Sequence, residues 1–580
     1  KNKLFKNYIG LGYHPSIMPS VIQRNILENP GWYTAYTPYQ AEIAQGRLEA
    51  LFNFQSLICD LTGMKISNAS LLDEGTAAAE AMGMLFSTRN SEKIKQNCVD
   101  YFVDKNTFPQ TISVMKTRAK PLGIKIHIGD PNEFKGKKSF FGAFFQYQGK
   151  SGNILNISRI STVLSETQIP IAISTDLLAL TMLEAPGKFN VDVVVGTSQR
   201  FGIPLGYGGP HAAFFATKEM YKRNIPGRII GQTVDIDGNP ALRMALQTRE
   251  QHIKRGRATS NICTAQVLLA VMAGMYAVYH GPHGLQKIAV DIHNKVKKLD
   301  HFLSNLNLKQ LNKSFFDTIH FKVNSKKLRE IAEKNGINFN YPDNNHVSIS
   351  INETTSENDL KEIITVFENY TGVKVKSNEI ILKDVIPLEI KRESSFLTNK
   401  IFNSHQSETS MMRYIKSLER KDLALNHSMI SLGSCTMKLN SANLMIPLSF
   451  PEWGNIHPFA PINQAEGYQK VLFSLTEMLN EITGFSSTSL QPNSGAQGEF
   501  SGLMVIRAYH ISNGDNHRNI CIIPSSAHGT NPASAVMAGM KVVVTGTDNN
   551  GNIDFEELKK HVIEHADNLA ALMITYPSTY

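Results

Sequence analysis

The chain has 580 residues, of which 42% are hydrophobic and 19% are charged, and its formal net charge is +9. This length supports several domains with buried cores, and no apolar run reaches the roughly 20 residues that a membrane span needs. Because the charge is small against the length and the lysines are scattered, the composition disfavours a membrane or a nucleic acid as a partner.

The cysteines and the chain ends give further limits. No CxxC pair and no Cys/His spacing of a zinc site joins the five cysteines, which are Cys59, Cys98, Cys263, Cys435 and Cys521. This pattern predicts a reducing compartment and no bound metal. The sequence begins at Lys1 without a methionine and stops inside an apolar stretch at 571–577. We therefore expect that both ends are cut and that a targeting peptide would lie outside this sequence.

An internal repeat organises the chain. Pro30 and Trp32 precede Pro451 and Trp453 by 421 residues, and the same offset relates the Thr-Gly pairs at 62–63 and 483–484. Between these markers, both copies place apolar residues at i, i+1, i+4, i+7, i+8 and i+11, the pattern of one helix face. These positions are Ala50, Leu51, Phe54, Leu57, Ile58 and Leu61 in the first copy and Val471, Leu472, Leu475, Met478, Leu479 and Ile482 in the second. The repeat predicts two copies of one unit, each with a long helix that ends at Thr-Gly.

The first copy is predicted to be an α/β unit with a smaller lobe. Apolar runs such as 191–195 alternate with helical stretches, which is typical of a mostly parallel sheet covered by helices. We assign residues 1–300 to this large domain. Strand-like runs at 318–323 and 347–351 and a helix near 359–370 predict an α+β lobe over 301–375, and the charged, polar stretch 376–426 is predicted to connect the copies.

The second copy, residues 427–580, contains a loop suited to an anion. Residues 491–499 are rich in small side chains and precede a helical stretch at 500–509. Backbone N–H groups at such a helix start, together with the Ser494 hydroxyl, would form a phosphate site. Taken alone, a glycine-rich helix start is more often a plain turn.

A histidine follows the next strand. After the run 519–523 comes a loop with His528 and several hydroxyls, and a further strand is predicted at 541–544. Ligands bind at the carboxyl ends of parallel strands, although a lone histidine is more often structural. The first copy has Phe108 where the second has His528, and an alignment anchored on Glu80 and Glu499 places residues 75–78 opposite Ser494–Gln497. The comparison predicts a catalytic second copy and a degenerate first copy.

Several long motifs resemble one known family, the glycine decarboxylase P-protein of the glycine cleavage system. They are 29–40 (NPGWYTAYTPYQ), 206–211 (GYGGPH), 431–440 (SLGSCTMKLN) and the loops around Asn493 and His528. The resemblance covers the chain from end to end. It implies two tandem fold-type I units of pyridoxal 5′-phosphate (PLP) enzymes, of which only the second binds the cofactor.

The resemblance also implies the reaction, the partners and the site. The family removes the glycine carboxylate as CO2 and transfers the aminomethyl group to the lipoyl arm of H-protein. It implies that Ser494, Gly495, Ala496 and Gln497, beside Asn493, hold the cofactor phosphate, that His528 stacks on the ring, and that Thr530 and Thr575 lie near it. A homodimer is expected, located in the cytoplasm of a bacterium or alternatively in the mitochondrial matrix.

One position departs from the family pattern. Gln199, in the register of the lysine that binds the cofactor covalently, cannot form an imine, although Asp176 keeps the acid that would face the ring nitrogen. By the repeat spacing, the lysine of the second copy is expected at about position 620–630, beyond Tyr580. We therefore predict that these 580 residues alone are inactive.

Some roles and alternatives stay open. Tyr33, Tyr36, Tyr39 and Glu42 either pack at an interface or reach the second copy's pocket, and Ser434 and Thr436 are further pocket candidates. Cys435 is either a redox-sensitive thiol or a small buried side chain. The alternatives for function are another fold-type I PLP enzyme, such as an aminotransferase or amino-acid decarboxylase, and a non-catalytic partner.

Overall fold

A seven-stranded sheet forms the centre of the first unit in the computed structural model, which describes residues 1–35, 37–137, 139–209, 211–263, 265–375, 382, 384–429 and 439–576. Strands β3 to β7 are parallel, and β8 runs antiparallel to β7 and β2. The predicted mostly parallel sheet is confirmed. In spatial order the strands are β2 (Ile66–Ser67), β8 (Ala213–Thr217), β7 (Val193–Thr197), β6 (Ile171–Asp176), β5 (Phe140–Gln146), β3 (Asp100–Asp104) and β4 (Lys125–Gly129).

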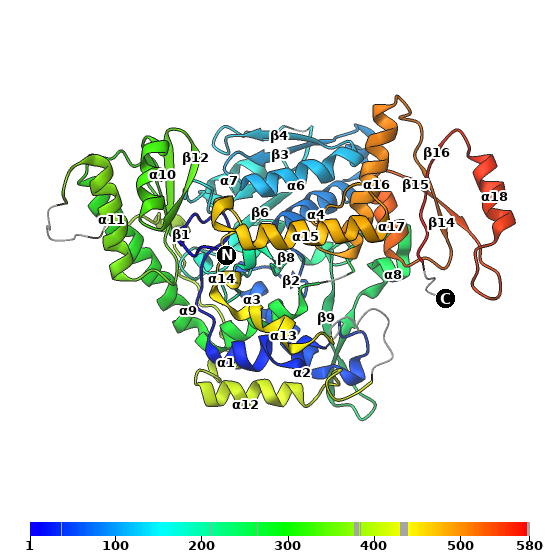
Figure 1. Cartoon of the computed structure of the whole chain (residues 1–580), viewed down its shortest axis with the longest axis horizontal. Coiled ribbons are helices and arrows are strands. Elements are labelled where there is room, and N and C mark those ends of the chain that lie inside the picture. Colours follow the sequence, from blue (N-terminus) through cyan, green and yellow to red (C-terminus); the bar gives the residue numbers. More distant parts are fainter. Residues whose placement is uncertain are drawn as a thin grey trace.

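Helices cover both faces of this sheet (Figure 1). Because successive side chains of a strand point to opposite faces, Val194 of β7 packs in one core and Val193 and Val195 pack in the other. The core that contains Val194 is formed with α3 (Gln45–Thr62), α7 (Ile157–Ser165) and α9 (Val267–Ser304), and the other with α4 (Glu74–Ser87) and α6 (Pro109–Ala119).

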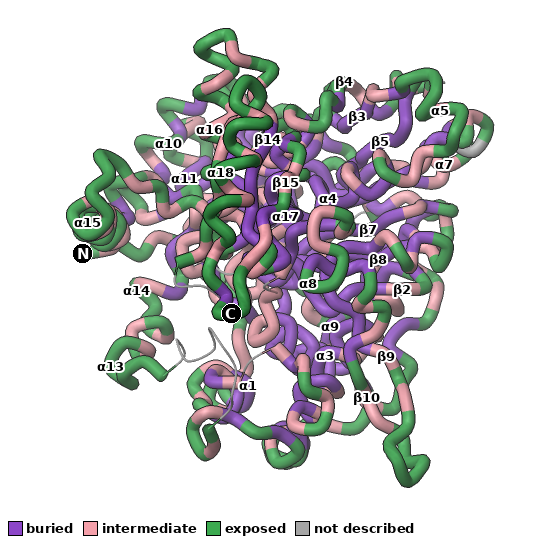
Figure 2. Tube along the Cα trace, turned by 90° about the vertical axis from the view of Figure 1, so that its right-hand side faces the viewer, coloured by how far each residue is buried: buried purple, intermediate pink, exposed green. Residues whose placement is uncertain are grey.

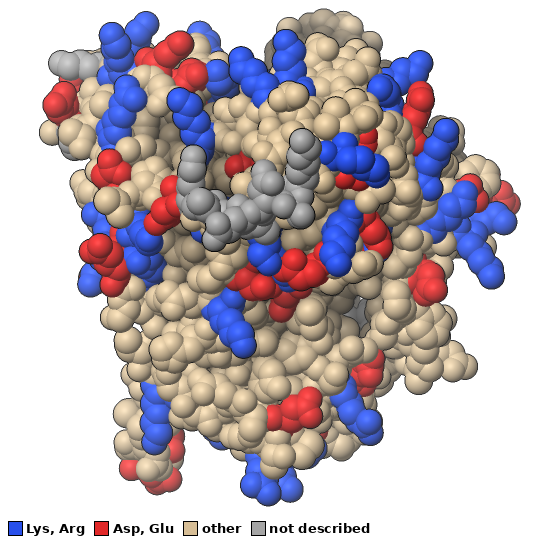
Figure 3. Space-filling view, turned by 90° about the vertical axis from the view of Figure 1, so that its left-hand side faces the viewer, with Lys and Arg blue, Asp and Glu red and all other residues tan. Residues whose placement is uncertain are grey.

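The smaller lobe is an α+β domain, as predicted, and it includes the start of the chain. Strand β1 (Lys6–Tyr8) pairs in parallel with β12, a contact that the sequence did not indicate. Figure 3 shows basic and acidic side chains interspersed over the face on the left of Figure 1, where this lobe lies. Its other elements are β11 (Thr318–Lys322), α10 (Ser325–Lys334), β12 (Ile337–Asp343), β13 (His346–Ser350) and α11 (Glu357–Thr371).

The segment after this lobe is folded against the first unit. Helix α12 (Glu408–Glu419) packs on α3 and buries Met411, Ile415 and Leu418. Gly46 makes this close approach possible, because a Cβ there would lie 2.0 Å from the Leu418 carbonyl oxygen. The stretch predicted as a polar connection is therefore part of the first unit's packing over the residues that the structure describes.

The second unit repeats the first. Helix α15 (Glu466–Thr483) matches α3 with an offset of 421, and both end at a left-handed glycine, Gly63 and Gly484. Strand β14 (Ile520–Pro524) matches β3 with an offset of 420, and the sheet order β15-β14-β16 repeats β4-β3-β5. The predicted duplication is confirmed. The remaining elements of this unit are α16 (Gly495–Ser512), α17 (Thr530–Met537), β15 (Lys541–Thr545), α18 (Phe555–Glu564) and β16 (Leu569–Leu572).

The two copies of the long helix differ in burial. Leu57 and Ile58 of α3 are fully buried, whereas Met478 and Leu479, their equivalents on α15, lie on a helix that buries no residue. Figure 2 shows α15 as largely exposed beside the buried interior of the first unit. Within the described residues, no helix is both long and apolar enough to cross a bilayer.

Short elements at the end of the first unit's sheet contact the second unit. The hairpin of β9 (Ile229–Val234) and β10 (Pro240–Ala245) precedes α8 (Gln251–Lys254), and α8 contacts α17. These elements bring residues 249–263 to the second unit. The other short helices are α1 (Ser20–Ile22), α2 (Pro30–Tyr33), α5 (Ser91–Lys95), α13 (Ala442–Met445) and α14 (Pro451–Gly454).

Candidate functional site between the two units

The amino end of α16 has the geometry of an anion site. Ser494 has extended backbone angles and its Oγ accepts from the Gln497 N–H at 3.3 Å, so it caps the helix. A Cβ at Gly495 or Gly498 would meet no heavy atom within 4 Å, so space is open beside the first turn. The Gln497 side-chain Nε2 is buried and has no hydrogen-bond partner among the described residues. Free backbone N–H groups and the helix dipole favour an anion here.

The equivalent helix of the first unit corrects one part of the sequence alignment. Helix α4 begins at the cap Asp73, whose carboxylate accepts from Thr76 N, and α16 begins at the cap Ser494. The caps are 421 residues apart, so Ser494 corresponds to Asp73 and not to Gly75, as the 419 offset predicted. Asn493 Nδ2 donates to Asp73 Oδ2 at 2.7 Å, which joins the two helix starts.

His528 lies in the loop between β14 and α17, at the carboxyl end of the strand. Its Nδ1 is 2.9 Å from the Thr530 hydroxyl, which donates to Glu499 Oε1 at 2.8 Å. The imidazole itself is exposed. Thr575, after β16, donates to the Asn531 side chain at 3.4 Å and so lies beside the same loop. The structure thus brings His528, Thr530 and Thr575 to one edge of the second sheet.

The first unit forms one wall of this site. Next to His528, Gly529 lies so close to α8 that a Cβ would be 2.3 Å from the Gln251 carbonyl oxygen. Arg255 Nη1 donates to the Ala527 carbonyl at 3.0 Å. The buried Asn261 Nδ2 donates to the Ala496 carbonyl at 3.0 Å and to Ser534 Oγ at 3.1 Å. These contacts tie the start of α16 and the His528 loop of the second unit to residues 251–261 of the first.

A thiol from the first unit pairs with His528. The hydrogen bond with Cys263 raises the pKa of His528. Although burial opposes ionisation of Cys263, the hydrogen bond from His528 and the charge of Arg228 lower the pKa of its thiol. Both shifts move the pair toward the thiolate and imidazolium forms. The sequence analysis missed Cys263 and Asn261, since 265 or more residues separate them from His528.

The aromatic candidates of the first unit separate into two groups. Tyr39 hydrogen-bonds to Cys263, and its ring lies 6.3 Å from that of His252, so it belongs to the wall. Tyr33 instead lines an apolar cavity of about 340 Å³ with Leu27 and Phe450, and Glu42 is exposed. The candidates Tyr36, Ser434 and Thr436, and with them Cys435, lie outside the described residues.

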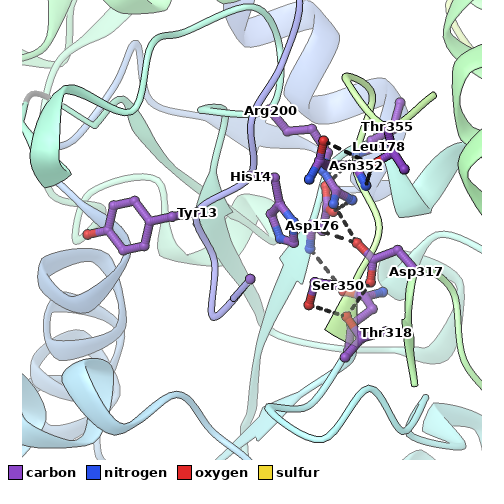
Figure 4. A network of polar contacts seen from close by, with 12 residues as sticks. Tyr13, His14, Asp176, Leu178, Arg200, Asp317, Thr318, Ser350, Asn352 and Thr355 are labelled. Atoms are coloured by element: carbon purple, nitrogen blue, oxygen red, sulfur yellow. Dashed lines mark hydrogen bonds and ion pairs between the residues drawn. The ribbon is translucent and has the colours of Figure 1, made fainter. Parts of the chain in front are cut away.

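In the first unit, polar side chains at the corresponding edge bind one another in a network (Figure 4). Gln199 accepts from His14 N at 2.9 Å and donates to His14 O at 2.9 Å and Ile203 O at 2.7 Å. The next residue, Arg200, is ion-paired with both Asp176 and Asp317. The acid that would face a ring nitrogen is therefore occupied by a guanidinium, which the motif comparison did not anticipate because it considered only position 199.

The same network bears on metal binding. His14, Asp176 and Asp317 bring ligand atoms within 4.8 Å of one another, but Arg200 already supplies the cation between the two carboxylates. Burial and the charge of Arg200 hold the pKa of His14 well below its usual value. The second grouping among the described residues is His561 and Glu564 of α18 with His565 directly after this helix, and none of them belongs to the His528 loop.

Comparison with known proteins identifies the family. The family model of the glycine cleavage system P-protein matches residues 1–367. The chain belongs to the glycine cleavage system P-protein family. Two relatives named glycine dehydrogenase (decarboxylating) support this, one from Christiangramia forsetii at 64% identity over 581 residues and one from Flavobacterium johnsoniae at 60%. Each alignment covers 100% of this chain and 61% of the relative, so the chain spans about three fifths of their length.

A solved P-protein has the same fold. The crystal structure of a glycine decarboxylase P-protein in inhibitor-bound form is similar with a TM-score of 0.59 and 27% identity, over 63% of this chain and 85% of that one. The family and the fold class predicted from the sequence are both confirmed.

Proposed function

We propose that this P-protein chain takes part in glycine decarboxylation, in which glycine loses CO2 and its aminomethyl group passes to the lipoyl arm of H-protein. The observation that carries this proposal is the shared edge between the units, where an anion-type helix start and the His528 loop meet a wall from the first unit. The relatives named glycine dehydrogenase (decarboxylating) support the same reaction.

The residues at this edge fit PLP. The capped start of α16, the open space beside Gly495 and the unpartnered Gln497 amide suit a phosphate. The exposed imidazole of His528 suits a flat ring. PLP, when bound, supplies an electron sink for the loss of CO2. We propose Asn493, Ser494, Gly495, Ala496, Gln497, His528, Thr530 and Thr575 as its binding residues.

The chain's own residues would hold and orient this site. Ser494 keeps the first turn of α16 formed, so that its N–H groups point to one place. Asn261 fixes the same turn from the other side through the Ala496 carbonyl. The Cys263 partner keeps His528 in one orientation and favours its charged form. Together they preorganise the pocket before any ligand enters.

We also propose that the first unit does not bind PLP. Gln199 cannot form an imine, and its amide is used in three backbone hydrogen bonds. Arg200 holds Asp176. Borohydride reduction after addition of equimolar PLP should label no single lysine of residues 1–375 preferentially, and one specifically labelled lysine in that range would contradict this assignment.

Exchange of labelled CO2 into glycine, measured with the complete protein and lipoylated H-protein, tests the function. Ser494→Ala should reduce exchange at limiting PLP by about tenfold, since a lost cap and anion contact is worth about 1 kcal/mol or more. Ser512→Ala, at the far end of the same helix, is the matched control. Exchange that does not depend on lipoylated H-protein would favour another fold-type I enzyme instead.

The assembly and the location are also proposals. Glycine and lipoylated H-protein are the partners, and we propose a homodimer, which light scattering of the complete protein tests. Because the relatives reported above are bacterial, we propose a cytoplasmic location.

A further inference from the structure

A separate cavity of about 40 Å³ lies at the carboxyl edge of the first unit's sheet. It is lined by Glu74, Gln146, Gln148, Lys150 and Arg200, among others. At about 10–15 Å³ per water molecule, it has room for about three waters, or for a ligand of similar size. It lies on the opposite unit from His528 and none of the proposed PLP-binding residues lines it.

Buried hydrogen-bond acceptors are among the groups that line this cavity. Gln146 is 3% exposed, and its side-chain amide hydrogen-bonds to the buried Glu74 carboxylate. Its Oε1 is left buried with no partner among the described residues. Burial raises the pKa of Glu74 to about 7, although Ser174 donates to it. A buried carboxylate and a buried amide oxygen without a partner are stabilised by a donor that carries positive charge.

Hydrogen-bond donors line the same cavity. Gln148 Oε1 accepts from Asp176 N at 2.9 Å and from Thr175 Oγ1 at 3.2 Å, which fixes the orientation of its amide. Its Nε2 is then buried and has no partner among the described residues. The same holds for Nε of Arg200, the side chain whose two terminal nitrogens bind Asp176 and Asp317. The partly buried Lys150 lines the same cavity. N–H donors on three residues suit a carboxylate.

We propose that this cavity is a second, non-covalent site for a small α-amino acid zwitterion of about the size of glycine. The ammonium group binds at Gln146 and Glu74, and the carboxylate binds at Gln148, Arg200 and Lys150. The cavity volume excludes branched or aromatic amino acids. The site needs no PLP, so it is independent of the proposed function and gives the degenerate unit a ligand of its own.

Titration calorimetry of the complete protein, freed of PLP, tests the site with glycine as the probe. We expect glycine to bind, and acetate, methylamine and leucine to bind at least about tenfold more weakly, because each lacks one charged group or exceeds the cavity. Gln148→Leu should weaken glycine binding by about tenfold or more, the equivalent of a lost bond to a charged group. Gln96→Leu, the same change at an exposed glutamine, should not.

Two further results separate the alternatives. If His528→Asn abolishes glycine binding while Gln148→Leu leaves it intact, glycine occupies the second unit and the proposal is wrong. If the PLP-free protein binds no glycine at millimolar concentration, the cavity holds water only and the proposal is equally wrong. Crystals of the unmodified protein soaked in glycine provide a test that needs no variant, with density expected between Gln146 and Gln148.

Discussion

His528 of the second unit is hydrogen-bonded to Cys263 of the first. The family resemblance assigns the loop of this histidine to the cofactor ring, and it places Gln199 of the thiol's unit in the register of the lysine. A residue of the first unit therefore raises the pKa of a histidine in the second.

Removing the imidazole of His528 should lower the reactivity of the Cys263 thiol. In His528→Asn the hydrogen bond and charge of this partner are lost, so burial is opposed only by Arg228 and Tyr39 and the pKa of Cys263 should rise. Because the thiolate is the nucleophile and one pKa unit is a tenfold change in its fraction, alkylation of Cys263 near pH 7 should slow by about tenfold or more. Mass spectrometry of iodoacetamide-treated protein measures this. Cys59, where burial raises the pKa to about 12, should stay unreactive in both proteins. An unchanged rate at Cys263 would refute the pairing.

Asn261 should matter for stability as well as for the site. It is fully buried and donates to Ala496 O and Ser534 Oγ across the interface. Asn261→Ala leaves those acceptors without this donor, so we expect a loss of about 1–3 kcal/mol in the free energy of unfolding. Asn335→Ala, which removes an exposed side-chain bond to Ile331 O, should cost less than about 0.5 kcal/mol. Equal losses in the two variants in urea would show that the interface contact has no special role.

Arg200→Met should destabilise the first unit most strongly at neutral pH. The variant leaves Asp176 and Asp317 buried without their cation, at a cost of about 3–5 kcal/mol. In the unmodified chain, burial raises the pKa of Asp317 but the charge of Arg200 outweighs it, so the pKa of Asp317 is lowered. The stabilisation from Asp317 is therefore present above the pKa that this carboxyl has in the unfolded chain, and it is lost as the pH falls through the lower pKa of the folded state. In the unmodified chain, burial already raises the pKa of Asp176 despite Arg200; in the variant, burial raises the pKa of Asp317 and raises that of Asp176 further, so the deficit should shrink toward pH 5. Urea unfolding at pH 8 and pH 5 measures both, with the exposed Arg420→Met as control.

Two helix glycines should respond in opposite ways to alanine. In Gly46→Ala the new Cβ would lie 2.0 Å from the Leu418 carbonyl oxygen, so α12 must move from α3 and stability should fall by about 1–3 kcal/mol. In Gly83→Ala, within α4, the Cβ meets nothing within 4 Å, and helix propensity predicts a gain of up to about 1 kcal/mol. Thermal unfolding of the two variants separates these effects. Similar changes in the unfolding temperature of the two variants would mean that helix propensity alone determines the effect of alanine at both positions.

Much of the fold could be predicted because its signals are local and repeated. Leu57 and Met478 occupy the same position on two amphipathic helices, and β3 and β14 follow as apolar runs at one offset. The alignment of the helix starts failed where Glu80 and Glu499 suggested an offset of 419. Asp73 and Ser494 are both strong N-cap residues, and comparing caps would have given the observed 421.

The composition of the site was less predictable, because its wall comes from distant sequence. No local pattern places Asn261 beside Ala496 or Cys263 beside His528. The ion pair of Arg200 with Asp176 could have been predicted from the sequence. An arginine directly after Gln199 can neutralise the acid at Asp176, because both strands end at the same edge of the sheet. The pairing of β1 with β12 likewise depends on a contact between the two ends of the first unit.

The wall formed by residues 251–263 also sets an order of events during synthesis. His528 leaves the ribosome 265 residues after Cys263, and domains generally fold from the amino end as they emerge. The first unit is therefore expected to be folded when the loops of the second unit emerge, and these loops then pack against its surface. The loops of the second unit thus emerge beside a surface of the first unit that is already folded.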